Sequence, residues 1–88
     1  MQVTPESYEV ATSTEGLEYY VATIPLAGIT QYDVPVIDVA LSADVDAAVL
    51  QLEAFQTISQ VITTNGNLVL YNYNSAPEVN FTLNVIIR

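Results

Sequence analysis

The C-terminal segment shows the most regular alternation of apolar and polar residues in the chain. Between Glu78 and Ile87 every second residue is apolar, and this two-residue period predicts a β-strand with one face on a core. The apolar positions are Val79, Phe81, Leu83, Val85 and Ile87. On the other face lie Asn80, Thr82 and Asn84. These three are candidates for a subunit contact, and the pattern equally allows water or a ligand there.

A β-hairpin is predicted immediately before that strand. The segments 57–64 and 67–74 flank Asn65-Gly66, the strongest short signal for a two-residue type I′ turn, in which both central residues need positive φ. The expected pairs are Thr64 with Asn67, Ile62 with Val69, Gln60 with Tyr71, and Ile58 with Tyr73. This register decides which side chains share a face of the hairpin.

The tyrosines of this hairpin are candidate contact residues. The register places Tyr71 and Tyr73 on one face, and Asn72 on the opposite face beside apolar residues. Planar rings stack on sugars or fill protein interfaces, although they are also ordinary strand residues. The candidate glycan or subunit contact consists of Tyr71, Tyr73, Asn72 and Asn74.

One helix is predicted, over residues 43–56. Ser42 is placed to cap its free amide groups, and Asp44 and Asp46 bring negative charge to the positive end of the helix dipole. An apolar stripe at helical spacing follows, and we expect the helix to lie on a sheet by this stripe. The stripe consists of Val45, Ala48, Val49, Leu52 and Phe55.

The N-terminal half completes the predicted fold. Residues 1–18 are rich in Thr, Ser and Glu and form either an arm or an edge strand around residues 7–12, whereas residues 19–88 form one β-rich module. A strand over residues 18–24 is apolar on both sides, and another begins after Pro35. The chain is therefore predicted to be mainly β, of the α+β class. We expect an antiparallel sheet or sandwich with one short helix packed on it.

Size and composition indicate a small folded domain that associates with itself. The chain has 88 residues, so it holds one domain. Its 51% hydrophobic residues and mean hydropathy of +0.37 exclude a disordered chain. It contains no cysteine and no histidine, so neither a disulfide nor a zinc site can stabilise it. Oligomerisation is the remaining means of stabilising so small a core.

The charge balance excludes several classes of partner. Ten acidic residues stand against one cation, Arg88, for a net charge of -9. Nucleic acids and anionic membranes are bound through cations, so neither is an expected partner. No apolar run approaches the roughly 18 residues of a membrane span, and the N-terminus shows no signal-peptide pattern. The simplest interpretation of the charge is solubility at high local concentration.

Enzymatic chemistry has little support in the sequence. Histidine, cysteine and lysine, the usual general bases and nucleophiles, are absent. A pair of carboxylates is the remaining catalytic device, but Asp44 and Asp46 are better explained by the start of the helix. They match a calcium loop only very weakly, and the isolated glycines form no nucleotide-binding motif. We therefore expect no enzyme activity, catalytic residue, metal or cofactor.

A resemblance to a known family runs through residues 19–88. It is carried by the segment DVPVIDVALS before the predicted helix, by LEAF within it, and by APEVN and the terminal arginine after the hairpin. The matching positions are Asp33, Pro35, Val36, Asp38, Val39, Leu41, Ser42, Leu52, Glu53, Ala54, Phe55, Ala76, Pro77, Val79, Asn80 and Arg88. On these residues the chain resembles the small C-terminal module of structural proteins from tailed bacteriophages and prophages of Gram-positive bacteria. Its Thr- and Glu-rich N-terminus departs from the Gly/Ser/Trp-rich start of that pattern.

The resemblance implies a virion structural protein that is assembled in the cytoplasm of a bacterial host. Such modules resemble parts of tail fibres, head fibres and baseplates, which are commonly homotrimeric, so identical copies and other phage virion proteins are the implied partners. The shared positions are fold determinants, and no catalytic or sugar-binding residue is carried over. We expect a homotrimeric head-fibre, tail-fibre or capsid-decoration component. The alternative is a receptor-binding module of a phage tail that binds host cell-surface glycans.

Overall fold

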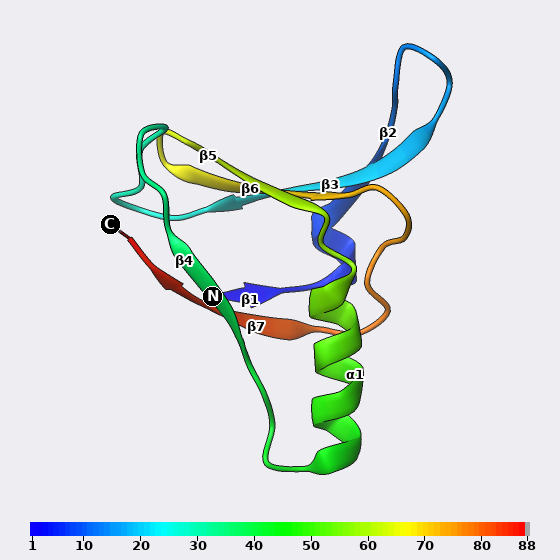
Figure 1. Cartoon of the computed structure of the whole chain (residues 1–88), viewed down its shortest axis with the longest axis vertical. Coiled ribbons are helices and arrows are strands. Elements are labelled where there is room, and N and C mark those ends of the chain that lie inside the picture. Colours follow the sequence, from blue (N-terminus) through cyan, green and yellow to red (C-terminus); the bar gives the residue numbers. More distant parts are fainter. Residues whose placement is uncertain (88) are drawn as a thin grey trace.

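The computed structural model describes residues 1–87, which form two antiparallel β-sheets, one α-helix and one short 3-10 helix (Figure 1). In chain order the elements are β1 (Gln2–Val3), the 3-10 helix η1 (Pro5–Ser7), β2 (Tyr8–Thr12), β3 (Glu18–Pro25), β4 (Val36–Ala40), α1 (Val45–Gln56), β5 (Gln60–Thr64), β6 (Asn67–Asn72) and β7 (Phe81–Ile86). One sheet has the order β1-β7-β4, and the other has the order β2-β3-β6-β5. The predicted mainly β, α+β class is confirmed.

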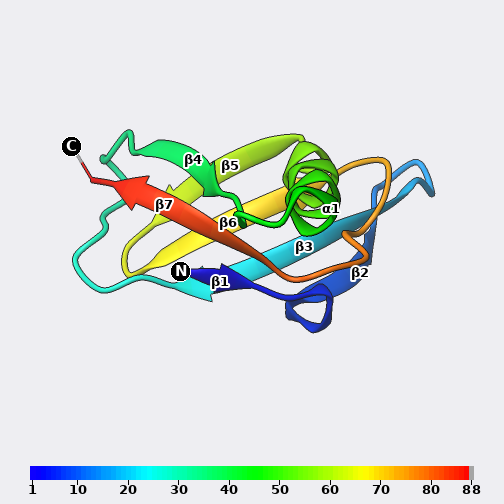
Figure 2. The ribbon, with the colours of Figure 1, turned by 90° about the horizontal axis from the view of Figure 1, so that it is seen from below.

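The two sheets pack face to face, and the hydrophobic core lies between them (Figure 2). The three-stranded sheet contributes Phe81 and Leu83 of β7 and Val3 of β1, all almost completely buried. The four-stranded sheet contributes Leu68 and Leu70 of β6, which are fully buried. These residues belong to one continuous cluster, as expected of a small antiparallel sandwich.

Strand β7 shows the alternation predicted from the sequence. Phe81 and Leu83 are buried, while Thr82 and Asn84 are exposed. β7 is the central strand of its sheet, with β1 on one side and β4 on the other. The strand begins at Phe81 rather than at the predicted Glu78, because β1 and β4 provide pairing partners only from Phe81 onward.

The β5–β6 hairpin has the predicted two-residue loop and nearly all of the predicted register. The pairs are Thr64 with Asn67, Ile62 with Val69, and Gln60 with Tyr71. The expected pair of Ile58 with Tyr73 is wrong, because β5 begins only at Gln60. Ile58 lies two residues after the end of α1, and its N–H donates to the Phe55 carbonyl oxygen at 3.2 Å.

The turn of this hairpin differs from the predicted type I′ geometry. Gly66 has a φ of 87°, but Asn65 keeps a negative φ, a combination found in type II turns. The Gly66 N–H donates to the Ile29 carbonyl oxygen, and the Asn65 Oδ1 accepts a hydrogen bond from the Gln31 N–H. Because these bonds hold the turn from outside, it does not need the geometry of a free-standing hairpin.

The N-terminal segment is part of the sandwich rather than a free arm. β2 is the edge strand predicted around residues 7–12, and it pairs with β3. The tip of the β2–β3 hairpin extends beyond the rest of the sandwich (Figure 1). β1 pairs with β7 and buries Val3 in the core. This second pairing joins residues near opposite ends of the chain, so no local pattern in the sequence indicates it.

Helix α1 begins two residues later than predicted. Asp44, rather than Ser42, is the N-cap, and its Oδ2 accepts the Ala47 N–H at 3.1 Å. Ser42 lies two residues before the N-cap, and its Oγ accepts the Asp44 N–H. Asp44 has extended backbone angles, with φ -75° and ψ 121°, so the helical conformation starts only after it.

The face by which the helix packs on the sandwich overlaps the predicted stripe only in part, at Ala48 and Phe55, which are half-buried. Ala54 is buried and Ala47 is half-buried, whereas Val45 and Val49 are 73% and 50% exposed. Of the larger residues in the predicted stripe, only Phe55 packs against the core. α1 contacts β7 and β4, and its N-terminal half projects past them (Figure 1). The small alanine side chains allow a close approach to the sandwich, so the valines face outward.

Candidate functional site

Three tyrosine rings meet on the outer face of the four-stranded sheet. Tyr71 lies on β6, Tyr19 lies on the neighbouring β3, and Tyr73 follows directly after β6. The ring centroids are 6.1–6.3 Å apart, in tilted and edge-on orientations. These separations are typical of interacting aromatic rings, so the three side chains form one cluster. The structure thus brings together the two predicted tyrosines and adds Tyr19.

The cluster belongs to a broader surface, which we call the tyrosine face. Side chains alternate along each strand, so the register identifies the residues that share a face with Tyr71. They are Glu9 and Ala11 of β2, Tyr19, Val21, Thr23 and Pro25 of β3, Asn67 and Val69 of β6, and Gln60, Ile62 and Thr64 of β5, with Tyr73 beside them. Ile62 is 40% exposed and Tyr73 is 48% exposed. Glu9, on the edge strand, is the one charged member of this set.

The two asparagines that the sequence associates with these tyrosines lie elsewhere. Asn72 points to the core side of β6 and is fully buried, so it is not part of the tyrosine face. Asn74 is exposed in the loop that follows β6. The surface part of the predicted contact is therefore Tyr71 and Tyr73, with Asn74 in the adjacent loop.

Asn72 joins several segments through hydrogen bonds inside the protein. Its Oδ1 accepts from the Tyr8 hydroxyl at 3.0 Å. Its Nδ2 donates to the Thr57 Oγ1 at 2.7 Å and to the Ser75 carbonyl oxygen at 3.1 Å. The Thr57 hydroxyl in turn donates to the Ala54 carbonyl oxygen at 2.6 Å. These bonds connect β2, β6, the end of α1 and the loop after β6.

The Tyr8 hydroxyl of this network is held in its protonated form. Burial raises the pKa of Tyr8 from 10.0 to about 12, because a phenolate would be poorly hydrated there, and the hydrogen bond with Asn72 partly opposes this effect. Within residues 1–87, every buried side-chain nitrogen or oxygen has a hydrogen-bond partner. A saturated network with a neutral phenol suits a structural role rather than proton transfer.

The outer face of the three-stranded sheet is the second candidate surface, which we call the β7 face. Thr82 and Asn84 are exposed on it, and Asn80 is exposed in the loop before β7. Asn84 lies directly opposite Asp38 of β4, and Thr82 lies opposite Ala40. A carboxylate therefore lies beside the predicted contact residues on this face.

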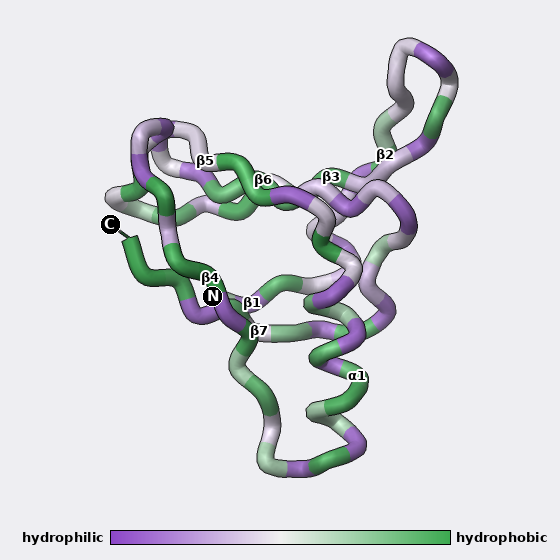
Figure 3. Tube along the Cα trace, in the orientation of Figure 1, coloured by the Kyte–Doolittle hydropathy of each residue, from purple (hydrophilic) through white to green (hydrophobic). Residues whose placement is uncertain are grey.

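The projecting half of α1 carries a third exposed surface, which includes large apolar side chains. Apolar and hydrophilic residues are interspersed along the helix (Figure 3). Val45, Val49 and Leu52 are exposed and follow one another at helical spacing. Asp46 directly follows Val45, and Glu53 directly follows Leu52. This stripe is the one that the sequence predicts as the buried face, and it is flanked by negative charge.

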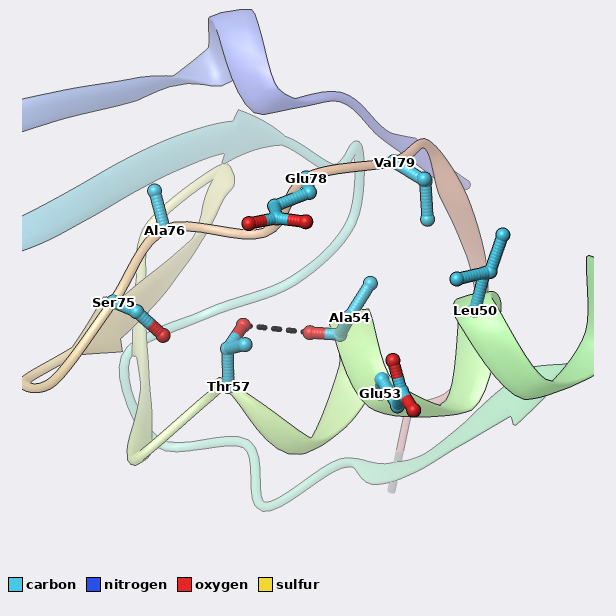
Figure 4. Close-up of a pocket in the computed structure, with 8 residues that line it drawn as sticks. All are labelled: Leu50, Glu53, Ala54, Thr57, Ser75, Ala76, Glu78 and Val79. Carbon is cyan, nitrogen blue, oxygen red and sulfur yellow. Dashed lines mark hydrogen bonds between the residues drawn. The ribbon is translucent and has the colours of Figure 1, made fainter.

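A cavity of about 250 Å³ lies between α1 and the loop after β6 (Figure 4). It is lined by Leu50, Glu53, Ala54, Thr57, Ser75, Ala76, Glu78 and Val79. Glu53 comes from the helix and Glu78 comes from the loop opposite. The Thr57 hydroxyl is already bonded to the Ala54 carbonyl oxygen. The lining side chains offer carboxylate and hydroxyl oxygen atoms but no nitrogen base.

Neither a metal site nor a membrane-spanning helix is found among residues 1–87. No group of three or more His, Cys, Asp or Glu side chains in this range could hold a metal ion. The helix described here is too short to cross a bilayer. Glu9, Asp38 and Asp46 instead lie on three different surfaces of the molecule.

Tyr19 is the member of the cluster that sequence reasoning does not group with Tyr71 and Tyr73. Alternation places Tyr19 and Val21 on the same side of β3, and β3 pairs with β6 so that Val21 lies opposite Tyr71. β4, α1 and β5 separate the two strands along the chain. The alternation is visible in the sequence, but the long-range pairing that joins the rings is not.

No family model, no curated protein and no solved structure matches this chain. The proposed function therefore rests on the surfaces of the structure and on the residues that carry the resemblance to phage structural modules.

Proposed function

We propose that this chain is a non-enzymatic structural protein of a bacteriophage virion, where it forms a homotrimeric part of a head or tail fibre or decorates the capsid. The observation that carries the proposal is the apolar surface that a single copy leaves exposed. Large apolar side chains are exposed on all three surfaces, for example Ile62, Val49 and Ile86. Contacts between copies would remove such side chains from water.

The dimensions of the chain also support association. Its accessible surface is 5553 Å², whereas a compact monomer of its 9.6 kDa mass exposes about 5,100 Å². Its radius of gyration is 13.2 Å, against about 12 Å for a compact domain of this length. The tip of the β2–β3 hairpin and the N-terminal half of α1 project from the sandwich and add to this surface (Figure 1). Such a shape is typical of a subunit that is completed by its neighbours.

The chemistry of the chain favours a structural role over catalysis. Histidine, cysteine and lysine are absent from the sequence, so the carboxylates are the remaining candidates for acid–base work. The cavity beside α1 presents Glu53 and Glu78, but its lining holds no histidine, cysteine or lysine that could work with them. Asn72 is buried, and its side-chain amide is bonded within the protein to Tyr8, Thr57 and Ser75.

The assignment to a virion draws on the resemblance to phage structural modules. Residues that carry it have structural positions here: Pro35 precedes the edge strand β4, Phe55 packs against the core, and Pro77 is buried. These three residues contribute to the fold of the chain. The proposed partners are identical copies and other virion proteins, and the proposed site of assembly is the bacterial cytoplasm.

Native mass spectrometry of the purified chain tests the homotrimer. The expected result is a species of three times the chain mass that persists on dilution. A monomer at all concentrations would contradict the proposal. The virion assignment is tested separately by proteomics of purified particles from a phage or prophage that encodes the chain. Peptides of the chain are expected at stoichiometric amounts, and their absence from intact particles would rule out a virion component.

A second candidate function is binding of host cell-surface glycans. The observation that favours it is the cluster of Tyr19, Tyr71 and Tyr73, because exposed aromatic rings stack on sugars. Asn74 in the adjacent loop adds an exposed amide. A glycan array with the purified oligomer tests this candidate. Binding that is lost in Tyr73→Ala but kept in the control Tyr32→Ala would support it, and an array without signal would remove it.

A further inference from the structure

We infer that the tyrosine face is the surface through which copies of this chain contact one another. The inference rests on the proposed function in one respect, namely that the chain acts as a homo-oligomer. It goes further by choosing one of the three exposed surfaces as the interface. The choice follows from where the negative charges of the chain lie.

Electrostatic repulsion opposes self-association of this chain, because every copy has a net charge of -9. A carboxylate that is trapped between two copies loses hydration, and the single cation of the sequence cannot neutralise ten acids. A contact between identical acidic chains is therefore favourable only where the contact surface carries almost no charge. This condition can be checked surface by surface.

The tyrosine face meets the condition. Its one acidic member, Glu9, lies on the edge strand β2, where it can remain in solvent at the rim of a contact. Towards the middle of the sheet the face carries Thr23, Val69 and the tyrosine cluster. The other nine acids lie outside the set of residues that the register assigns to this face. They are Glu6, Glu15, Glu18, Asp33, Asp38, Asp44, Asp46, Glu53 and Glu78.

The other two surfaces do not meet the condition. On the β7 face, Asp38 lies opposite Asn84 and next to the polar residues predicted as contacts. On α1, the exposed stripe of Val45, Val49 and Leu52 has acids as immediate neighbours. Apposing either surface to its copy would bring carboxylates together without a counter-ion.

The residues of the tyrosine face also have the right chemistry for a second copy. Tyrosine is enriched in protein interfaces, because its ring buries apolar area while its hydroxyl still finds a hydrogen-bond partner. Val21 and Ile62 supply β-branched side chains beside the rings, and Val69 lies buried beneath the same face. Flat sheet faces of this kind pack on each other at about 10 Å, as in the protein's own core.

The same residues fit other occupants less well. A basic partner protein would select acids, and the face has one, at its edge. A glycan needs free polar groups around the rings, but the Gln60 Oε1 already accepts from the Tyr73 hydroxyl at 2.6 Å. The identical, nearly uncharged faces of the other copies, gathered about the threefold axis of the proposed homotrimer, are the partner that fits this surface best.

A pair of matched variants tests the interface. Thr23 and Thr82 are both exposed threonines on central strands, but Thr23 is on the tyrosine face and Thr82 is on the β7 face. Thr23→Glu adds a charge to the inferred interface, and Thr82→Glu adds the same charge outside it. By sedimentation velocity we expect Thr23→Glu to weaken association about tenfold or more, and Thr82→Glu to leave it within about twofold. Circular dichroism checks that both variants remain folded.

Single-cysteine crosslinking gives an independent readout that does not depend on the charge variants. The chain has no cysteine, so one introduced thiol can pair only between copies. Thr23→Cys is expected to form a covalent dimer with a short bifunctional maleimide, and Thr82→Cys is not. If Thr23→Glu fails to fold, this comparison decides the question.

The possible outcomes separate the interface from the proposed function. An oligomer that is disrupted by Thr82→Glu or Val49→Glu, and not by Thr23→Glu, overturns the interface and leaves the homo-oligomer standing. A wild-type chain that stays monomeric at every concentration overturns both. A monomer whose tyrosine face binds a glycan or a basic protein overturns the interface and favours that occupant.

Discussion

Asn72 is the residue whose side chain connects the largest number of segments in the protein. It is fully buried, and its amide bonds to the Tyr8 hydroxyl, the Thr57 hydroxyl and the Ser75 carbonyl oxygen. A buried amide is costly unless all of its groups are paired, and here they are. One side chain thus fixes how the end of α1, the edge strand β2 and the loop after β6 meet.

Replacing this side chain should destabilise the fold strongly. Asn72→Ala leaves the Tyr8 and Thr57 hydroxyls without one partner each, so we expect a loss of about 3 kcal/mol in the free energy of unfolding. Urea denaturation followed by circular dichroism measures it. The matched control, Asn74→Ala in the exposed loop, should change stability by less than about 0.5 kcal/mol. Equal effects in the two variants would contradict the structural role of Asn72.

Tyr8 gives the fold a predictable dependence on alkaline pH. Its pKa is about 12 in the folded chain and 10.0 in the unfolded chain, so the folded state holds the phenolic proton more tightly. This contribution to stability is fully present below pH 10 and is lost as the pH rises through 10 to about 12. Urea denaturation of the wild type and of Tyr8→Phe checks it. The difference between their unfolding free energies should be constant below pH 10 and shift against the wild type above it. A constant difference throughout would contradict the prediction.

At the scale of elements, α1 has an alanine buried and most of its large apolar residues exposed, with Phe55 as the exception. Ala54 is buried against the sandwich, whereas Val45 and Val49 are mainly in contact with water. A helix on the surface of a monomer normally shows the reverse, because burying large side chains yields more stability. Ala54 lies on the side of α1 that contacts the sandwich, where the helix meets β7 and β4, and Phe55 is the one large side chain of the predicted stripe that packs there.

This orientation of α1 predicts how substitutions on its exposed and buried sides change stability. Val49→Gln should change the stability of a single copy by less than about 0.5 kcal/mol, because Val49 has little core contact to lose. Ala54→Asp should cost about 1–3 kcal/mol, because it places a carboxylate at a buried position near Glu53 and Glu78. Thermal unfolding of both variants measures this. A large loss for Val49→Gln with tolerance of Ala54→Asp would support the face predicted from the sequence instead.

Local patterns predict the elements of this fold better than their pairing. The alternation around Phe81 and Leu83 gives the buried face of β7, and Asn65-Gly66 gives the loop length and register of its hairpin. Each of these two patterns involves residues that are close together in the sequence. The pairing of β1 with β7 and the meeting of Tyr19 with Tyr71 depend on contacts between distant segments, which periodicity does not encode. The face of α1 also depends on its distance from the sandwich, which the spacing of apolar residues does not reveal.

At the scale of the whole molecule, the chain is flat and has its charge distributed unevenly. Its extents are 40, 33 and 17 Å, so broad sheet faces make up much of its surface. One of these faces holds three tyrosine rings and a single edge carboxylate, while the acids gather on edges, loops and the helix. Copies of such a strongly acidic molecule repel one another least when they associate through the nearly neutral tyrosine face.

This distribution predicts that added salt strengthens association. Between about 10 mM and 150 mM salt the screening length falls from about 30 Å to 8 Å, so repulsion between copies carrying -9 each is reduced. We expect the dissociation constant of the oligomer to fall about threefold or more over this range. Sedimentation velocity at several salt concentrations measures it. Weaker association at higher salt would indicate an interface held by ion pairs instead.

The tyrosine cluster also gives the protein a built-in optical reporter. The chain has no tryptophan and six tyrosines, and half of them lie in the cluster. Ultraviolet emission of the unlabelled chain therefore comes from phenol rings alone, with a large share from the surface on which the copies would meet. Dilution of the unmodified protein in a fluorimeter would then follow assembly in real time, without a dye or a tag that could disturb it.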